Sequence, residues 1–255
     1  MKLTMMVKKF VPTTAVLLGV GLLTSGPAAQ SQTLLNVKIG KTANDYSGGG
    51  GPESNGAYQE SPLAVLGSAD SWWNEYAFVS STPSGVSVVD STGSTFAGVS
   101  LTVQNTSGVG SLSVSGNPSF LMDNMPYQNP GPGNVYNISL SGLQANTQYE
   151  FVGYAANPNY SAGASWTVTT GTPGAGVFSN DGSSADITTG VGKAYSRFFV
   201  TTDGAGSLAI TDASQSGTYP ILQGFQLAQV IPEPATFGLA GLGLISILAR
   251  RRRLR

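Results

Sequence analysis

The sequence predicts an all-β protein, in which a single antiparallel β-sandwich lies between an N-terminal signal helix and a short C-terminal transmembrane helix. Turn-forming residues are abundant, with 34 glycines and 14 prolines among 255 residues. Short apolar or alternating segments recur between these turns, and no sustained 3.6-residue period indicates a long amphipathic helix. Hydrophobic residues make up 40% of the chain, which is enough to build a core and argues against disorder.

Residues 1–31 have the three-part layout of a secretory signal peptide. Lysines at the start precede an uncharged stretch at 10–23, and small residues follow it. Ala29 and Ser31 frame a cleavage site of the A-x-A type, with cleavage after Ala28 as the alternative. The apolar stretch is short for a span of about 20 residues, which favours a cleaved signal peptide over an uncleaved signal anchor. We therefore expect export by the Sec machinery.

Residues 32–230 form the predicted sandwich. Residues 35–39 alternate polar and apolar side chains, which is typical of a half-buried strand. The other predicted strands are residues 86–89, 99–103, 112–114, 135–140, 149–154, 166–170, 194–201, 208–211 and 222–227. Clusters of Gly, Pro, Asn, Asp and Ser separate them, for example at 129–134. Many short strands at this spacing are typical of an antiparallel sandwich.

Residues 231–255 combine a proline-rich linker, an apolar stretch and a basic end. Pro232 and Pro234 lack N–H groups and end the preceding strand. Residues 235–249 carry no charge, and a helix of that length spans about 22 Å, less than the ~30 Å hydrocarbon core. The stop-transfer cluster consists of Arg250, Arg251, Arg252 and Arg253. Because such a cluster stays in the cytoplasm, we expect a transient anchor in the inner membrane.

Pro232, Glu233 and Pro234, followed by the apolar stretch and the arginines, resemble the PEP-CTERM sorting signal in order, spacing and terminal position. The resemblance implies an exopolysaccharide-producing Gram-negative bacterium and a membrane protease-transpeptidase, exosortase, that acts at or near these three residues. The alternative is a plain tail anchor with a proline-rich linker. Both basic ends prefer the cytoplasmic side, so the body is expected outside the inner membrane, and finally at the cell surface or in the extracellular matrix.

Two parts of the body resemble known sandwiches. Residues 140–149 resemble the strand, turn and strand with a Tyr corner of fibronectin-type domains. Residues 206–211 and 221–227 resemble the last hairpin of galactose-binding-like jelly rolls. The number of predicted strands favours the jelly roll, so we expect the fibronectin likeness to be local.

Several chemistries are excluded or disfavoured by composition. The chain has no histidine and no cysteine, which excludes zinc sites, Ser-His-Asp triads, Cys-His dyads and disulfides. Most basic residues lie at the two ends, so the body is acidic and unsuited to nucleic acid. Residues 181–186 offer Asp, Ser and Ala at the ligand positions of a calcium loop, a poor set for Ca²⁺. We therefore predict no catalytic residues, no metal, no cofactor and no nucleic-acid partner.

Trp72 and Trp73 are the candidate carbohydrate-binding residues. Neighbours in a strand point to opposite faces, so at most one of them is expected in the core. The other would stack on a pyranose; the alternative interpretation is that it lies partly buried beside a loop.

The acidic residues of the N-terminal part are a candidate for a different chemistry. A glycosidase needs two carboxylates at a set separation, and solvated surface acids are the default interpretation. The residues are Asp45, Glu53, Glu60, Asp70 and Glu75.

We predict a non-enzymatic protein of the cell surface or extracellular matrix, a carbohydrate-binding or exopolysaccharide-associated module. The alternatives are a secreted polysaccharide hydrolase with paired carboxylates and a purely structural matrix protein.

Overall fold

A computed structural model describes residues 34–40, 57–59, 65–67, 72–77, 86–106, 109–113, 124–128, 133–160, 162–215 and 219–231. The predicted signal helix and the predicted transmembrane helix lie outside these residues. Within the described ranges, no helix is long and apolar enough to cross a membrane.

The described chain is built from fifteen strands and one short 3₁₀ helix. They are β1 (Leu34–Gly40), β2 (Ala57–Gln59), β3 (Trp72–Ala77), β4 (Val86–Val89), β5 (Thr95–Asn105), β6 (Val109–Ser113), β7 (Asn124–Gln128), β8 (Val135–Ser141), β9 (Gln148–Tyr154), β10 (Ala156–Asn157), β11 (Ala162–Thr170), β12 (Thr172–Val177), η2 (Ile187–Thr189), β13 (Tyr195–Thr201), β14 (Leu208–Ser214) and β15 (Gly224–Gln229). This composition confirms the all-β class.

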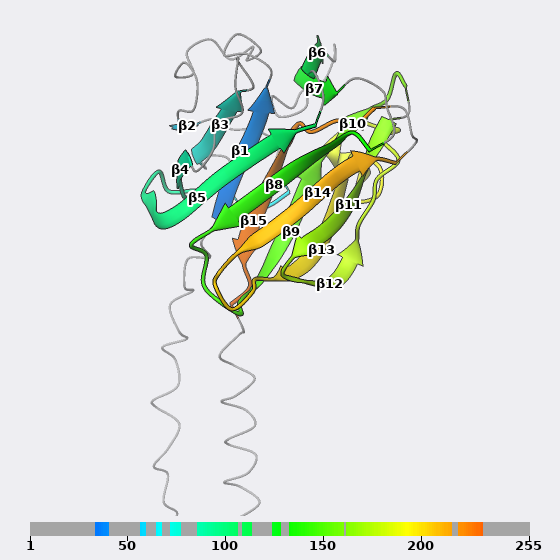
Figure 1. Ribbon diagram of the computed structural model, residues 1–255. Coiled ribbons are helices and arrows are strands. Elements are labelled where there is room, and N and C mark those ends of the chain that lie inside the picture. The colour runs from blue at the N-terminus through cyan, green and yellow to red at the C-terminus, as the bar shows by residue number, and fades with distance from the viewer. Residues whose placement is uncertain are drawn as a thin grey trace, which may run out of the picture. The chain divides into compact units, whose positions relative to one another are not determined.

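Two large sheets pack against each other (Figure 1). The seven-stranded sheet has the order β12-β13-β9-β15-β1-β3-β2, and the six-stranded sheet has the order β10-β11-β14-β8-β5-β4. Strands β6 and β7 form a separate pair. Two large β-sheets are thus present, and the jelly-roll sandwich remains a prediction.

The prediction that the sheets are purely antiparallel is wrong at one position. β1 and β3 run parallel, with Val37 opposite Asn74, whereas the other pairs of described strands are antiparallel. A parallel pair needs a long crossover connection. The chain between Gly40 and Trp72 provides it, and β2 within that connection pairs antiparallel with β3.

The core lies between the two large sheets, within one compact unit that spans Gln32–Ile231. On β8 the side chains alternate, and Tyr136, Ile138 and Leu140 are buried, as expected for a strand with one covered face. Phe151 on β9 and Trp166 on β11 meet edge to face across the two sheets, with ring centroids 5.3 Å apart. The alternation of apolar and polar residues that predicts these strands therefore also identifies side chains that form the core.

The Tyr corner predicted for residues 140–149 is present. The Gln144 N–H donates to Tyr149 Oη at 3.2 Å, a hydrogen bond from the tyrosine back to the chain a few residues upstream. Asn146 in the turn has a φ of 51°, which asparagine adopts more readily than most residues. This hydrogen bond fixes the turn between β8 and β9.

Gly153 on β9 is required by close packing. A Cβ at this position would lie 2.4 Å from Trp166 Cζ2, and Trp166 is buried with 3% exposure. Because a packed core accommodates extra atoms only by strain, Gly153→Ala is expected to lower the free energy of unfolding by about 1–3 kcal/mol. Urea denaturation measures this change. Gly204→Ala is the control, since a Cβ there meets no atom within 4 Å; equal effects of the two substitutions would contradict the packing explanation.

Candidate functional site

The tryptophan pair has one ring in the core and one ring half-buried beside a turn. Trp73 is 0% exposed and Asn74 is 7% exposed. Neighbouring strand residues point to opposite faces, so the burial of both residues means that both faces of β3 are covered. Trp72 is half-buried, and a Cβ on Gly93 would lie 2.7 Å from its indole Nε1. Trp73 therefore cannot stack on a sugar, and Trp72 packs against the turn between β4 and β5.

Most other predicted site residues lie outside the described part of the chain. They are Ala29 and Ser31 of the signal cleavage site, Pro232, Glu233 and Pro234 of the sorting motif, and the stop-transfer residues Arg250, Arg251, Arg252 and Arg253. The same holds for Asp45, Glu53, Glu60 and Asp70 and for the side chain of Glu75. The last described residue, Ile231, directly precedes the sorting motif.

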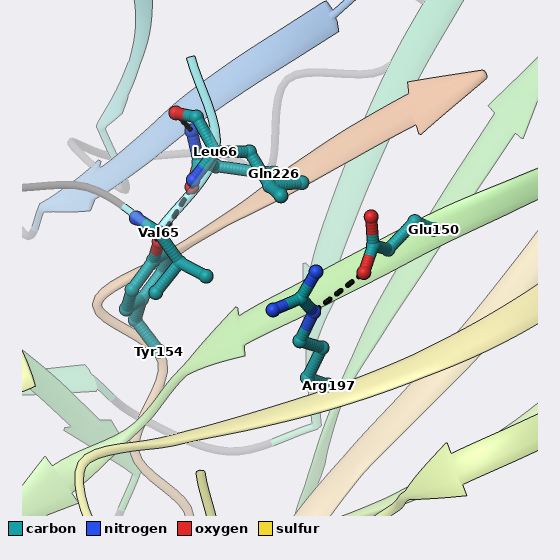
Figure 2. Close-up of polar contacts among 6 residues, drawn as sticks. All are labelled: Val65, Leu66, Glu150, Tyr154, Arg197 and Gln226. Carbon is teal, nitrogen blue, oxygen red and sulfur yellow. Dashed lines mark hydrogen bonds and ion pairs between the residues drawn. The ribbon is translucent and has the colours of Figure 1, made fainter. Parts of the chain in front are cut away.

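Two described carboxylates are held by basic side chains. Glu150 on β9 accepts a hydrogen bond from Arg197 Nε on β13 (Figure 2). Asp181 accepts from Lys193 Nζ at 2.6 Å. This bond, together with hydrogen bonds from Ser183, lowers the pKa of Asp181 to about 2. Among the described residues no group of three or more Asp, Glu, His or Cys side chains is arranged to hold a metal ion.

Three further carboxylates shape turns. Asp90 and Asp203 each accept from the backbone N–H groups two and four residues further along, at 2.7–3.1 Å. Asp186 caps η2 by accepting from the N–H of Thr188 at 2.9 Å. Such Asx hydrogen bonds replace those of a regular turn, so these carboxylates have structural partners.

Asp212 on β14 is a buried acid. Its side chain is 0% exposed, and no described residue makes a hydrogen bond to either carboxylate oxygen. In the strand register it lies between Tyr136 on β8 and Trp166 on β11. Burial in this apolar layer disfavours the charged form and raises the pKa of Asp212 well above its usual range. Asp212 is therefore a determinant of stability and lies out of reach of a surface ligand.

A buried amide network fixes residues 65–67 to the seven-stranded sheet (Figure 2). The N–H of Val65 donates to Tyr154 Oη at 2.9 Å, and the N–H of Leu66 donates to Gln226 Oε1 at 3.0 Å. Gln226 Nε2 donates in turn to Leu66 O at 2.7 Å and to Asn36 Oδ1 at 2.8 Å. These polar groups satisfy one another, as buried groups must, so we assign the network a structural role.

Three tyrosines from distant parts of the sequence meet at the surface, and we call Tyr127, Tyr160 and Tyr219 the tyrosine cluster. Tyr127 belongs to β7, Tyr160 follows β10 and Tyr219 precedes β15; β7 and β10 lie at the same end of the body (Figure 1). The ring centroids of Tyr127 and Tyr219 are 5.3 Å apart, and those of Tyr160 and Tyr219 are 5.8 Å apart. Tyr160 is 59% exposed.

Sequence reasoning missed the tyrosine cluster because its members are far apart in the chain. The one local signal is the turn sequence Asn157-Pro158-Asn159, which places the next residue, Tyr160, at the surface.

The outer face of the six-stranded sheet carries a shallow hollow of about 230 Å³. Hydroxyl side chains line much of it, and Ser100 Oγ lies 2.8 Å from Ser141 Oγ. We call it the hydroxyl hollow; its lining residues are Ser100, Thr102, Ser139, Leu140, Ser141, Thr170, Ser207, Leu208 and Ala209. Besides the tyrosine cluster, the hydroxyl hollow is a second surface feature that a small neutral ligand could occupy.

Comparison with solved structures gives a weak likeness for the body. The enzymatically active domain of tailspike protein 4 from bacteriophage CBA120 matches at 13% sequence identity with a TM-score of 0.23. The match covers 52% of this chain and 18% of that chain, so the chain spans less than a fifth of the tailspike domain. A likeness of this size supports no argument about fold or function. No curated protein matches the chain in sequence.

The comparison with family models is informative at the C-terminus. The model of the PEP-CTERM protein-sorting motif matches residues 230–253, the segment in which sequence order and spacing resemble this signal. The motif implies processing by an exosortase. The chain is therefore an exported protein with a C-terminal PEP-CTERM sorting motif.

Proposed function

We propose that this exported protein is a non-catalytic component of the cell surface or extracellular matrix that binds polysaccharide. In this account the Sec machinery exports the chain and the segment after residue 231 anchors it transiently in the inner membrane. Exosortase then acts at Pro232-Glu233-Pro234 and frees the body from that anchor. The likeness of the motif to signals of exopolysaccharide-producing bacteria supports a polysaccharide as the partner.

The state of the described carboxylates supports a non-catalytic role. A glycosidase uses two carboxyl groups about 5–10 Å apart on either side of an accessible bond. Each carboxylate whose side chain is described has a basic or turn partner or is buried: Asp90, Glu150, Asp181, Asp186, Asp203 and Asp212. Binding without hydrolysis is therefore the function that these described carboxylates favour.

Sedimentation with polysaccharide tests this proposal. The full chain, mixed with exopolysaccharide from its own host, is expected to sediment with the polymer and to release no new reducing ends. Heat-denatured protein is the control for trapping in the pellet. Accumulation of reducing ends would instead favour a hydrolase, and protein that stays in the supernatant would favour a purely structural role.

A further inference from the structure

Given the polysaccharide binding proposed above, we infer that the tyrosine cluster is the site at which the body binds a neutral saccharide, with a sugar ring stacked on Tyr160. Tyr127 and Tyr219 form the wall beside it. The site lies apart from Trp72, the residue of the tryptophan pair that keeps some exposed surface.

Tyr160 is displayed by a rigid turn. Its N–H donates to Asn157 O at 3.2 Å, and the N–H of Asn159 donates to Asn157 Oδ1 at 3.1 Å. Pro158 has a fixed φ, and Asn157 at the base of the turn is 0% exposed. A ring held in place before binding loses little conformational entropy when a ligand arrives. The 59% exposure of Tyr160 also means that the fold gains little from its burial.

The other two rings are fixed by the backbone behind them. Tyr127 pairs with Ile221 in an isolated bridge, and the N–H of Gln128 donates to Pro220 O at 3.1 Å. The ring planes are tilted, by 49° between Tyr127 and Tyr219 and by 69° between Tyr160 and Tyr219. The cluster therefore offers angled ring faces with phenol groups at their edges. Burial and the neighbouring phenols raise the pKa of Tyr219, and like any phenol its hydroxyl is a hydrogen-bond donor at neutral pH.

The surroundings of the cluster favour a neutral ligand. The segments that carry the three tyrosines, at 124–128, 157–160 and 219–223, contain no charged residue. Anionic polymers such as nucleic acids need cationic side chains for binding, and these segments supply none.

Within the described ranges, the exposed apolar surface is too small for a protein partner. The large hydrophobic residues exposed in the described part of the chain are Tyr160, Val177 and Val191. A stable protein interface buries about 800 Å² on each side around an apolar centre. Aromatic faces with phenol hydroxyls instead match a pyranose, which has apolar C–H faces and a rim of hydroxyls, because aromatic rings pack on apolar groups while their polar ends make hydrogen bonds.

Isothermal titration calorimetry of the full chain tests the site. The probes are cellohexaose, laminarihexaose and mannohexaose as neutral chains and hexagalacturonate as an anionic one. We expect at least one neutral chain to bind more tightly than the anionic one. Tyr160→Ala should weaken that binding by about tenfold, the effect of losing one stacking contact. Tyr160→Phe, which keeps the ring, should stay within about twofold, and both variants should melt at the temperature of the wild type.

Variants at the two other candidate surfaces, Trp72 and the hydroxyl hollow, distinguish those surfaces from the tyrosine cluster. Trp72→Ala and Ser139→Ala are expected to bind like the wild type. Loss of affinity in either one, with full affinity in Tyr160→Ala, would overturn the tyrosine site and leave the proposed polysaccharide binding intact. Saturation transfer in NMR is an independent readout, since irradiated tyrosine protons should transfer to sugar C–H protons. Absence of binding to all three neutral probes would overturn the site, whereas the sedimentation test decides the proposed function separately.

Discussion

Replacing Pro232, Glu233 and Pro234 by alanine is expected to leave export intact and to retain the full-length protein in the inner membrane. Both prolines fix φ and lack N–H groups, and Pro234 biases Glu233 towards an extended backbone. Proteases commonly bind extended substrates, so the wild-type motif is already shaped for recognition. Alanine removes both restraints and the carboxylate together. Fractionation of the envelope, followed by immunoblotting, should show a change from processed protein to full-length protein.

Cleavage at the motif is compatible with the fold, because the last strand ends before the motif begins. β15 ends at Gln229, and the N–H of Val230 donates to Gln148 O on β9 at 2.9 Å. The motif begins directly afterwards, at Pro232, so cleavage there removes no strand from the sheets. Gln215→Ala, at an exposed position upstream of the matched residues 230–253, is the control and should be processed normally. Normal processing of the triple-alanine variant would contradict recognition at this motif.

Asp212→Asn is expected to stabilise the body at neutral pH by about 2 kcal/mol, because folding of the wild type must either bind a proton at Asp212 or bury its charge, whereas the asparagine amide is neutral in both states. Above about pH 4, where an unfolded aspartate titrates, the native state keeps a proton that the unfolded chain has released. The free energy of unfolding therefore falls as the pH rises from there to the raised pKa of Asp212. The asparagine variant should lack this decline.

Urea denaturation between pH 4 and pH 8 measures the effect of Asp212→Asn. Asp90→Asn makes the same change of charge in the turn between β4 and β5, where an amide oxygen can still accept from the N–H groups of Thr92 and Ser94. It should keep the decline of stability with pH that Asp212→Asn loses. A lower stability of Asp212→Asn at pH 7 would mean that the ionised carboxylate stabilises the core, contrary to our account.

Sequence patterns predicted several strands closely. β8 alternates apolar and polar side chains, and the predicted bounds of β8, β9 and β13 differ by at most one residue from those observed. β3 was missed because the consecutive buried residues Trp73 and Asn74 remove the period-two pattern. β12 was missed for the opposite reason: all six of its residues are exposed, and its Pro173 is tolerated at the edge of a sheet.

Whether a site can be predicted from the sequence depends on how far apart its residues lie along the chain. The sorting motif is contiguous, so order and spacing sufficed to identify it. The tyrosine cluster draws Tyr127, Tyr160 and Tyr219 from three segments that only the folded sheets bring together, and no local pattern links them. The pair Trp72 and Trp73 is conspicuous in sequence, yet the cover on both faces of β3, which depends on remote segments, buries one ring and half-buries the other.

Mass spectrometry of the C-terminus of the surface protein tests the central claim, that the chain is sorted by an exosortase. The protein is taken from the envelope or medium of a host that has the enzyme. Our account predicts a C-terminal peptide that ends at or near Pro232-Glu233-Pro234 and lacks the arginine cluster. A surface protein that still ends at Arg255 would contradict exosortase sorting and leave only a tail anchor.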